Sequence, residues 1–354
     1  MPLDLQFPGS ARLGAPSTAR PGLVDRFGRV ARDLRVSLTD RCNLRCSYCM
    51  PPEGLDWLPS EATLTDGEVV RLVRIGVEEL GIRQVRFTGG EPLLRRGLEG
   101  IIAGCAELTT DQGRAPDLAM TTNALGLARR ARSLRAAGLG RVNISLDSLD
   151  PALFAAITRR DRLGDVLAGI DAAIEAGLAP VKVNTLVLRG VNEAGLPDLV
   201  DYCLERGIEL RVIEQMPIGP PDTWDRRRIL TADEILHIMS ARHELSPLPR
   251  EDPHAPAARW MVDGDPRRTV GVIASVSEPF CGACDRTRLT SDGQIRSCLF
   301  STEEFDLRAR LRGGASDQEL ARAWADAMWA KPAAHGLDTD AFARPSRTMS
   351  RIGG

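Results

Sequence analysis

Short hydrophobic runs with strand character alternate with longer segments of helical periodicity along most of the chain. Six runs predict strands, at 33–38, 83–88, 117–121, 142–146, 181–187 and 210–214. Segments with helical spacing lie between them, at 66–80, 98–108, 125–137, 163–176 and 196–206. Alternation of this kind predicts parallel strands joined by crossover helices. We therefore expect an α/β fold whose six units form an incomplete (β/α)6 barrel.

Polar residues gather where these predicted strands end. In chain order they are Cys42, Cys46 and Cys49, then Gly89 to Pro92, Thr121 to Asn123, Ser145 and Asp147, and Glu214 to Met216. Lys182 and Asn184 lie inside the fifth strand and Arg211 inside the sixth. Barrel enzymes place their chemistry at the carboxyl ends of the strands. The coincidence therefore predicts an active site at that end of the barrel.

The pattern changes after Met216. A helix is predicted at 231–242, a Pro-rich connector at 246–259, a strand at 271–276 and a helical region at 302–330. The first residues are rich in Pro, Gly, Ala and Ser, which is typical of a loose tail. The expected organisation is a flexible tail at 1–25, a barrel at 26–245 and a C-terminal region with its own tail at 246–354.

Composition excludes several classes of protein. The 46 basic and 48 acidic residues of the 354 give a net charge of −2, which argues against binding to nucleic acid by bulk charge. No apolar run approaches the ~18–20 residues that a membrane span needs. The N-terminal sequence has no apolar core behind basic residues, so we expect no secretory signal and a cytoplasmic location.

The cysteines carry the first specific chemical signal. Six of the eight form two groups of three, Cys42, Cys46 and Cys49 in C-x3-C-x2-C and Cys281, Cys284 and Cys298 in C-x2-C-x13-C. Disulfides are improbable without a secretory signal. A closed zinc site or a fully ligated iron–sulfur cluster usually takes four protein ligands, so three leave one metal position open for chemistry. Cys105 and Cys203 lie in helical patterns, and we expect them to be small buried hydrophobes.

Other catalytic signatures are missing from the sequence. It has no G-x-x-x-x-G-K-[ST] phosphate loop, no H-E-x-x-H and no nucleophile elbow. A phosphorylated substrate would therefore need scattered arginine and lysine side chains. Lys182 and Lys331 are the only lysines among the 46 basic residues, and Lys182 lies within a predicted strand.

The motifs around both cysteine groups resemble a known family. TDRCNLRCSYCMP, with TGGEP some forty residues later, is similar to the radical S-adenosylmethionine (SAM) superfamily. FCGACDRTRLTSDGQIRSCLF, with RDLRVSLTDRCN, MTTN, NISLD, VKVN, EQMPIG and the terminal Gly-Gly, resembles the GTP 3′,8-cyclase family of molybdenum-cofactor biosynthesis. The match runs from about Arg32 to Gly354.

The resemblance implies two 4Fe-4S clusters, one held by each cysteine group, with SAM completing the first. The positions that match SAM-binding residues of the family are Tyr48, Gly90, Ser145 and Met216. The positions that match GTP-binding residues are Arg35, Arg86, Thr121, Lys182, Arg286, Thr287 and Arg288. Gly89 and Gly90 are expected to give backbone room for the methionine end of SAM.

The resemblance also implies a reaction and partners. A radical formed from SAM would take the ribose 3′ hydrogen of GTP, and C3′ would attack C8, giving (8S)-3′,8-cyclo-7,8-dihydroguanosine 5′-triphosphate. An unidentified electron donor and a downstream cyclic pyranopterin monophosphate synthase are implied, as is a homodimer. Gln84 stands where a basic residue is expected, and Gly353-Gly354 resembles a tail that reaches the active site.

Two other readings stay open from the residues. A peptide-modifying radical SAM enzyme with an auxiliary cluster would share the first motif, and a non-catalytic module could bind zinc or a cluster. The basic strand residues, the spacing of the second cysteine group and the Gly-Gly end favour the cyclase.

Overall fold

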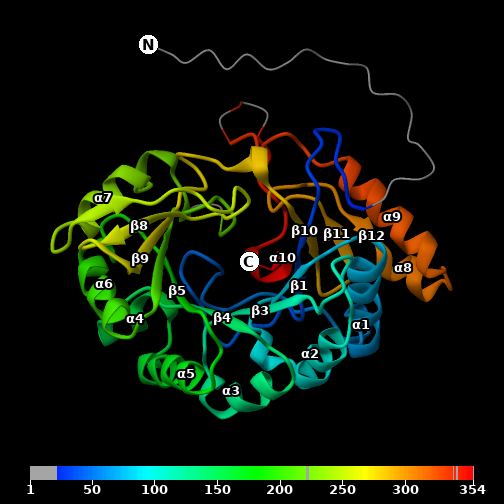
Figure 1. The fold of residues 1–354 in the computed structure, drawn as a ribbon, viewed down its shortest axis with the longest axis horizontal. Helices are drawn as coiled ribbons and strands as arrows, with labels where there is room; N and C mark the ends of the chain where they lie inside the picture. Colours follow the sequence, from blue (N-terminus) through cyan, green and yellow to red (C-terminus); the bar gives the residue numbers. More distant parts are fainter. Residues whose placement is uncertain (1–21, 221–222, 338, 340–341, 354) are drawn as a thin grey trace.

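The fold is a strongly curled sheet with helices on its outer face (Figure 1). The computed structural model describes residues 22–220, 223–337, 339 and 342–353. Within these residues one sheet has the strand order β12-β11-β10-β1-β2-β3-β4-β5-β6-β9-β8-β7. Its central run from β10 to β9 is parallel throughout. The predicted α/β partial barrel is therefore confirmed.

The six barrel strands lie close to their predicted positions. They are β1 Asp33–Ser37, β2 Gln84–Thr88, β3 Asp117–Thr122, β4 Arg141–Ser145, β5 Val181–Leu186 and β6 Glu209–Ile213. The remaining strands are β7 Leu245–Pro247, β8 Ala258–Val262, β9 Asp265–Ile273, β10 Arg286–Leu289, β11 Gln294–Arg296 and β12 Phe305–Asp306. Of these, only β9 overlaps a predicted strand.

The helices cover the outside of the sheet, except for the last. They are α1 Asp66–Arg74, α2 Leu98–Ala106, α3 Leu127–Ala136, α4 Pro151–Thr158, α5 Leu163–Glu175, α6 Leu196–Glu205, α7 Ala232–Met239, α8 Leu307–Arg312, α9 Asp317–Trp329 and α10 Met349–Ile352. Short 3-10 turns lie at Ser60–Ala62, Pro92–Leu94, Glu193–Gly195, Arg226–Arg228 and Cys281–Ala283. Helix α10 lies inside the ring of strands (Figure 1).

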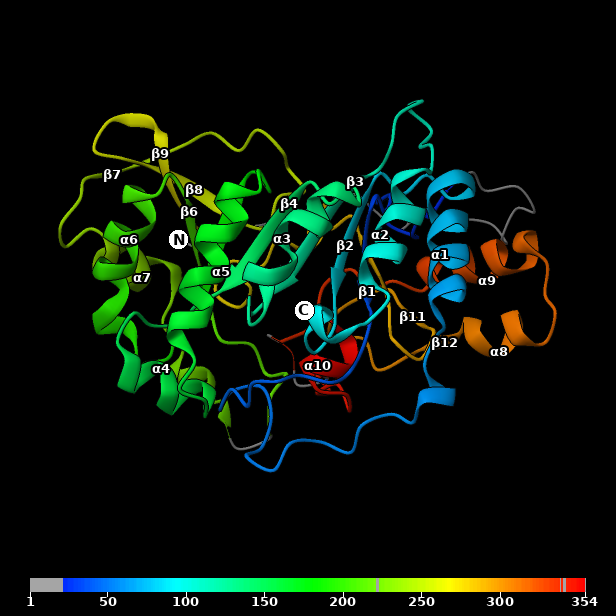
Figure 2. The same cartoon turned by 90° about the horizontal axis from the view of Figure 1, so that it is seen from below.

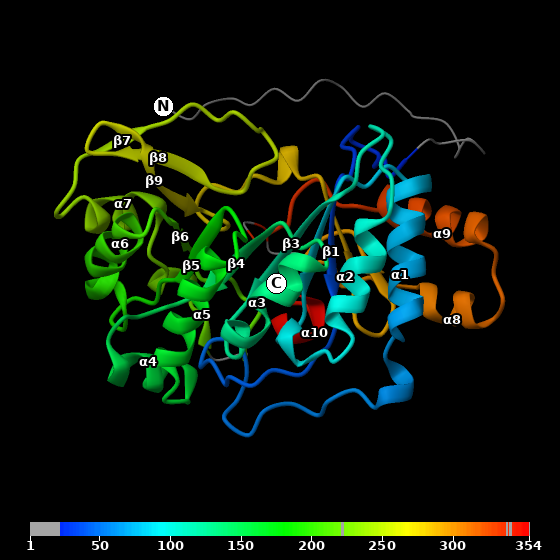
Figure 3. The ribbon, with the colours of Figure 1, turned by 60° about the horizontal axis from the view of Figure 1, so that its bottom comes forward.

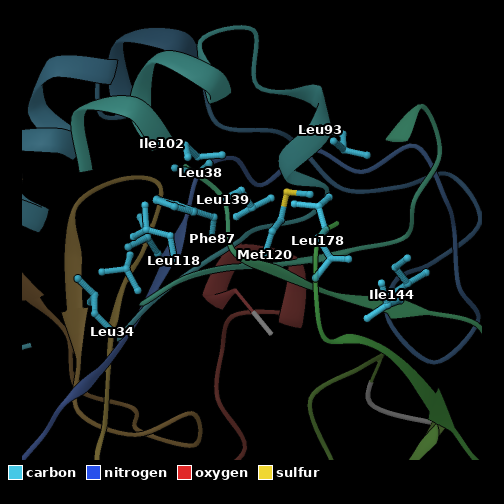
Figure 4. Packing of buried hydrophobic residues seen from close by; sticks show 14 of the residues in the cluster. Leu34, Leu38, Phe87, Leu93, Ile102, Leu118, Met120, Leu139, Ile144 and Leu178 are labelled. Carbon is cyan, nitrogen blue, oxygen red and sulfur yellow. The ribbon is translucent and has the colours of Figure 1, made fainter. Parts of the chain in front are cut away.

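Alternation along the strands separates the core from the barrel interior. On β1, Leu34 and Val36 are fully buried on the helix-covered side, whereas Arg35 lines the interior cavity. On β2, Phe87 packs into the core and Arg86 lines the cavity. Figure 4 shows Leu34 and Phe87 gathered with other apolar side chains between sheet and helices. Because side chains on a strand alternate between faces, each strand contributes both to the core and to the site.

Two predicted helices differ from the structure in informative ways. The 66–80 helix begins with a capping box between Thr65 and Glu68, but its last turn, Ile75–Glu79, is a π-helix. The 302–330 helix is wrong as one element, because Gly313 and Gly314 separate α8 from α9 and Gly314 has a φ of +87°. Helix α4 lay outside the predicted elements.

The segments after Met216 extend both edges of the barrel. Strand β10 pairs in parallel with β1, and β9 pairs in parallel with β6. Figures 2 and 3 show the two extensions at opposite sides, with α8 and α9 beside α1 and with β7, β8 and β9 beside α6 and α7. The division at residue 245 stays a prediction.

The N-terminal prediction falls mainly outside the described residues, since 1–21 are not described. Leu23 and Asp25 are buried, and Val24 bridges to Val30, so chain packing starts before residue 26. No helix in the described ranges is long and apolar enough to cross a bilayer.

Candidate active site

The barrel interior is a single large cavity of about 750 Å³. Both cysteine groups line it, the first on the loop after β1 and the second from the turn before β10 to the loop after β11. Parallel pairing of β1 with β10, with Arg35 opposite Arg288, brings these distant segments of sequence to one wall. The size is that of a site for small molecules.

The first cysteine loop is held by backbone contacts to α4. The N–H groups of Arg45 and Ser47 donate to the carbonyls of Thr158 and Ile157, each at 2.9 Å. The Met50 N–H donates to the Cys46 carbonyl at 3.1 Å. These bonds fix the loop between Cys42 and Cys49 without using the sulfur atoms, which stay free of disulfides.

Burial controls the chemistry of the first three thiols. It raises the pKa of Cys42 to about 11 and that of Cys49 to about 12, and it raises the Cys46 pKa well above its usual range. The thiols are therefore protonated without metal, and metal binding must release their protons.

Gly89 and Gly90 are required by close packing of two loops. A Cβ atom at Gly89 would lie 2.5 Å from the Thr39 carbonyl oxygen, and one at Gly90 would lie 2.2 Å from that of Arg41. Gly89 also has a φ of +146°. Gly90 lines the cavity. Both glycines are nevertheless required for packing rather than for room around a cofactor, because the loops after β1 and β2 contact each other through their backbones.

Glu91 ties the second strand end to the third, a role that the sequence analysis missed. Its carboxylate accepts from the Thr122 hydroxyl at 2.6 Å and from the backbone N–H groups of Asn123 at 2.7 Å and Leu93 at 3.0 Å. Burial raises the pKa of Glu91 to about 7, although these donors act against the shift. Asn123 in turn lies 3.8 Å from the Cys42 sulfur through its Nδ2 atom. The GGEP motif is the signal that could have identified Glu91.

Tyr48 and Asp147 join the first cysteine loop to the fourth strand end. The Tyr48 hydroxyl donates to Asp147 Oδ2 at 2.7 Å, and Asp147 Oδ1 accepts from the Leu186 N–H at 2.8 Å. Burial raises the pKa of Asp147 to about 6. With Gly90, the predicted SAM-binding residues Tyr48, Ser145 and Met216 all line the cavity.

The second cysteine group carries a different electrostatic environment. Cys284 follows the turn Cys281–Ala283, and its sulfur lies 3.4 Å from the Lys331 ammonium. Burial raises the Cys284 pKa, but the charges of Lys331 and Arg286 outweigh it, so the net shift is downward. Burial raises the pKa of Cys281.

The strands also supply a cluster of buried cations. Arg35, Arg86, Lys182, Arg286 and Arg288 line the cavity as predicted, and Arg211 joins them. Two carboxylates pair with this cluster: Asp33 lies 3.5 Å from Arg35 and 3.7 Å from Arg286, while Glu209 lies 3.2 Å from Lys182 and 2.5 Å from Arg211. Burial followed by repulsion from Arg35 lowers the pKa of Arg86 and of Arg288, each to about 9. Burial also lowers that of Lys182 to about 8.

Several of these cations have donors that the protein does not satisfy. Arg86 has no hydrogen-bond partner for Nε or Nη1, and the Nε atoms of Arg35 and Arg286 are also without one in the described structure. Buried charged donors are costly when unpaired. Their presence in a cavity indicates an anionic ligand.

One predicted ligand does not reach the cavity. Thr121 lines it, but Thr287 is fully buried on the other face of β10, where the Trp324 indole N–H donates to its hydroxyl at 3.0 Å. Since Arg286 and Arg288 face the interior, strand alternation turns Thr287 outward toward α9. The same alternation could have excluded the Thr287 side chain from sequence.

Gln84, which replaces an expected basic residue, is not isolated. Arg141 Nη2 lies 3.5 Å from Gln84 Oε1, and Arg141 pairs with Asp117. All three residues line the cavity. An arginine on β4, two strands away in the sheet, therefore supplies positive charge beside Gln84.

The C-terminal tail enters the same cavity. Met349 and Ser350 line it, Ile352 is fully buried, and Arg288 donates to the Gly353 carbonyl. A Cβ at Gly353 would lie 2.7 Å from the Thr88 hydroxyl. Gly354 lies outside the described residues. The predicted Pro-rich connector also contributes to the wall, with His254 at 2.7 Å from the Ala283 carbonyl.

The donor sets fit two clusters better than two closed sites. Each group offers three free, partly buried thiols that face one cavity. In the described ranges, no three His, Cys, Asp or Glu side chains converge as ligands of one metal ion. A multi-iron cluster instead binds each cysteine through a different iron, so it accepts separated thiols.

Comparisons with known proteins match nearly the whole chain. A model described as the radical SAM superfamily matches residues 36–203, and one described as molybdenum cofactor synthesis C matches 208–337. Curated relatives named GTP 3′,8-cyclase include proteins from Corynebacterium glutamicum (58% identical; 96% of this chain and 91% of the relative), Mycobacterium sp. strain KMS (57%; 97% and 99%) and Streptomyces coelicolor (56%; 96% and 99%).

Solved structures agree at the level of the fold. Streptococcus suis SuiB bound to S-adenosylmethionine has a TM-score of 0.52 at 15% identity, covering 84% of this chain and 67% of that chain. SuiB bound to precursor peptide SuiA has a TM-score of 0.51 at 17% identity, covering 86% and 65%.

Proposed function

The chain belongs to the radical SAM superfamily and, within it, to the family of GTP 3′,8-cyclases, and from this premise we propose how its residues carry out the reaction. It converts GTP to (8S)-3′,8-cyclo-7,8-dihydroguanosine 5′-triphosphate in molybdenum-cofactor biosynthesis, releasing 5′-deoxyadenosine and methionine. The observation that carries the proposal is the meeting, in one cavity, of two cysteine groups and of buried arginines that keep donor atoms without a hydrogen-bond partner.

Two 4Fe-4S clusters and SAM are the cofactors of this family. In the proposal, Cys42, Cys46 and Cys49 hold the first cluster, and Cys281, Cys284 and Cys298 hold the second. When bound there, the first cluster would supply the electron for the reductive cleavage of SAM. Tyr48, Gly90, Ser145 and Met216 would surround SAM.

The cations would hold the triphosphate. Arg35, Arg86, Lys182, Arg286 and Arg288 can replace phosphate hydration with charge-assisted hydrogen bonds, which are stronger inside a cavity than in water. Arg211 and Arg141 would add to this set, and Thr121 would contact GTP beside them. We do not retain the Thr287 side chain as a ligand, because Trp324 occupies its hydroxyl. Holding the triphosphate in this way would restrict where the ribose lies in the cavity that both cysteine groups line.

The wider biological setting is part of the proposal. An electron donor, not yet identified, would reduce the clusters, and a cyclic pyranopterin monophosphate synthase would consume the product. The chain would act in the cytoplasm, where thiols stay reduced and available to metal. A homodimer is also proposed.

The deciding experiment is an anaerobic assay of 5′-deoxyadenosine. The reconstituted enzyme is given SAM and a strong reductant with GTP, with ATP or without nucleotide. We expect formation to rise strongly with GTP alone, and a Cys42→Ala variant to form none while keeping its second cluster. Formation indifferent to GTP would point to another substrate, such as a peptide. Zinc without iron would favour a non-catalytic binding module.

A further inference from the structure

Lys331 is a buried cation that the reaction described above does not use. It follows α9 and is 3% exposed. Its ammonium donates to the Arg286 carbonyl at 2.8 Å, to the Cys284 carbonyl at 3.0 Å and to the Cys284 sulfur at 3.4 Å. An ammonium has three donors, so these acceptors occupy all of them.

The charge of Lys331 has no carboxylate partner among the described residues. Its acceptors are two backbone carbonyls and a sulfur. The other lysine, Lys182, is instead paired with Glu209 at 3.2 Å. A buried cation is costly without an anion nearby. The anionic charge available to Lys331 is that of the second cysteine group once its thiols are ionised by metal.

The first cysteine group has buried carboxylates near it as well as a cation. Asn123, whose backbone N–H donates to Glu91, lies 3.8 Å from the Cys42 sulfur, Asp147 accepts from Tyr48, and Arg45 donates to the Cys42 carbonyl at 2.6 Å. At the second group, the Lys331 ammonium lies 3.4 Å from the Cys284 sulfur, and the charges of Lys331 and Arg286 both lower the pKa of Cys284. The two sites therefore differ in electrostatic environment although they share one cavity.

We propose that Lys331 is a positioning residue that acts as counter-ion to the second cluster and raises its reduction potential. Reduction adds one negative charge to the cluster, and a cation against a ligating sulfur stabilises that state. The inference rests on the proposed assignment of the second cluster, but it does not depend on which nucleotide binds.

The test is a redox titration of the second cluster in the full-length chain. Cys42, Cys46 and Cys49 are replaced by serine so that only this cluster is reduced by dithionite, and its reduced state is followed by electron paramagnetic resonance. Lys331→Gln keeps a donor but removes the charge, and Lys331→Arg keeps the charge. Arg322→Gln removes an exposed charge from α9, the helix that precedes Lys331.

At the potential where half of the second cluster is reduced in the chain that keeps Lys331, we expect Lys331→Gln to lower the ratio of reduced to oxidised cluster about tenfold. This corresponds to a midpoint potential that is lower by ~59 mV for one electron. Lys331→Arg and Arg322→Gln should stay near the midpoint of the chain without either substitution. An unchanged potential in Lys331→Gln at full iron content overturns the inference. If Lys331→Gln loses its iron, retention of iron and potential by Lys331→Arg supports the charge requirement, and loss in both overturns it.

The outcomes separate this inference from the function. Zinc in place of iron at the second site of the unsubstituted chain overturns the cluster assignment and this inference together. A lowered potential in Lys331→Gln, with 5′-deoxyadenosine formation indifferent to GTP, supports Lys331 and rejects only the substrate.

Discussion

Several side chains in this cavity have donor atoms that the protein does not satisfy. Arg86 and Arg35 keep donors without a hydrogen-bond partner, whereas the buried carboxylates of Asp147 and Glu91 accept hydrogen bonds from the protein itself. Buried polar groups of this kind are usually satisfied, so those left over mark where a ligand binds.

Arg286 is predicted to contact GTP without affecting SAM. Its side chain is nearly buried, and its Nε atom has no hydrogen-bond partner. Arg286→Ala should raise the apparent KM for GTP about tenfold to a hundredfold, the loss expected for a hydrogen bond to a charged group. SAM binding, measured separately, should not change. Arg227→Ala, which removes an 88% exposed arginine, is the control. An unchanged KM would remove Arg286 from the site.

The raised pKa of Asp147 predicts that the stability of the folded chain depends on pH. Its folded pKa of about 6 is raised from 3.8, so its stabilising contribution is complete below pH 3.8 and is lost as pH rises through 6. Asn can still accept from the Leu186 N–H through its oxygen, and its Nδ2 can donate to the Tyr48 oxygen in place of the bond that Asp147 accepts. From pH 5 to pH 7, the free energy of unfolding of the wild type should therefore fall by ~1 kcal/mol more than that of the Asp147→Asn variant.

Urea unfolding of the iron-free chain at the two pH values measures this difference, with exposed Asp161→Asn as control. A difference between Asp147→Asn and wild type that stays constant from pH 5 to pH 7 would contradict the assigned burial of Asp147.

Elements place these side chains by packing and by backbone contact. Helix α9 is anchored through Trp324, which reaches Thr287 on β10, and through Asp317, which pairs with Arg71 and Arg74 on α1. The short helix α10 enters the barrel, and the Gly353 carbonyl directly after it accepts a hydrogen bond from Arg288. The contacts of α9 with α1 and β10 thus hold the region of the second cysteine group, and the contact of Arg288 with Gly353 holds the tail.

The packing of the C-terminal tail predicts that position 353 requires glycine. Gly353→Ala would put a methyl group 2.7 Å from the Thr88 hydroxyl at a φ of +87°, so we expect α10 to leave its position and GTP-dependent 5′-deoxyadenosine formation to fall at least tenfold. Gly190→Ala is the matched control, because Gly190 has a φ of +75° but nothing within 4 Å of the added atom. Equal losses in both variants would show that backbone strain, not the contact, is responsible.

At the scale of the whole molecule, the sheet brings the two cysteine groups to one cavity. Cys49 and Cys281 are separated by most of the barrel sequence, yet β10 pairs directly with β1. A ligand or cofactor bound at both groups would connect segments from the early and late parts of the sequence.

Metal removal should therefore weaken the whole fold. A chain depleted of iron should unfold at a Tm several degrees lower than the loaded enzyme, because cofactors that bind only the folded state stabilise it. Far-ultraviolet circular dichroism should still report the barrel at low temperature. The same Tm with and without iron would mean that the cysteine groups do not bind metal in the folded state.

Local signals in the sequence, together with the family resemblance, were enough to identify the barrel strands, both cysteine groups and a set of site residues that all line the cavity except Thr287. Strand periodicity and cysteine spacing are short-range properties, and they survive without knowledge of the fold. Even the outward direction of Thr287 was available from alternation along β10.

Only the tertiary structure shows which strands and side chains pair over long distances in the sequence. The pairing of β10 with β1, the entry of α10 into the barrel and the contact of Lys331 with Cys284 join residues far apart in sequence. Such contacts depend on how the complete sheet curls and on which buried groups then lack partners. No local pattern carries that information, because the free energy of burying a charge or a backbone depends on everything packed around it.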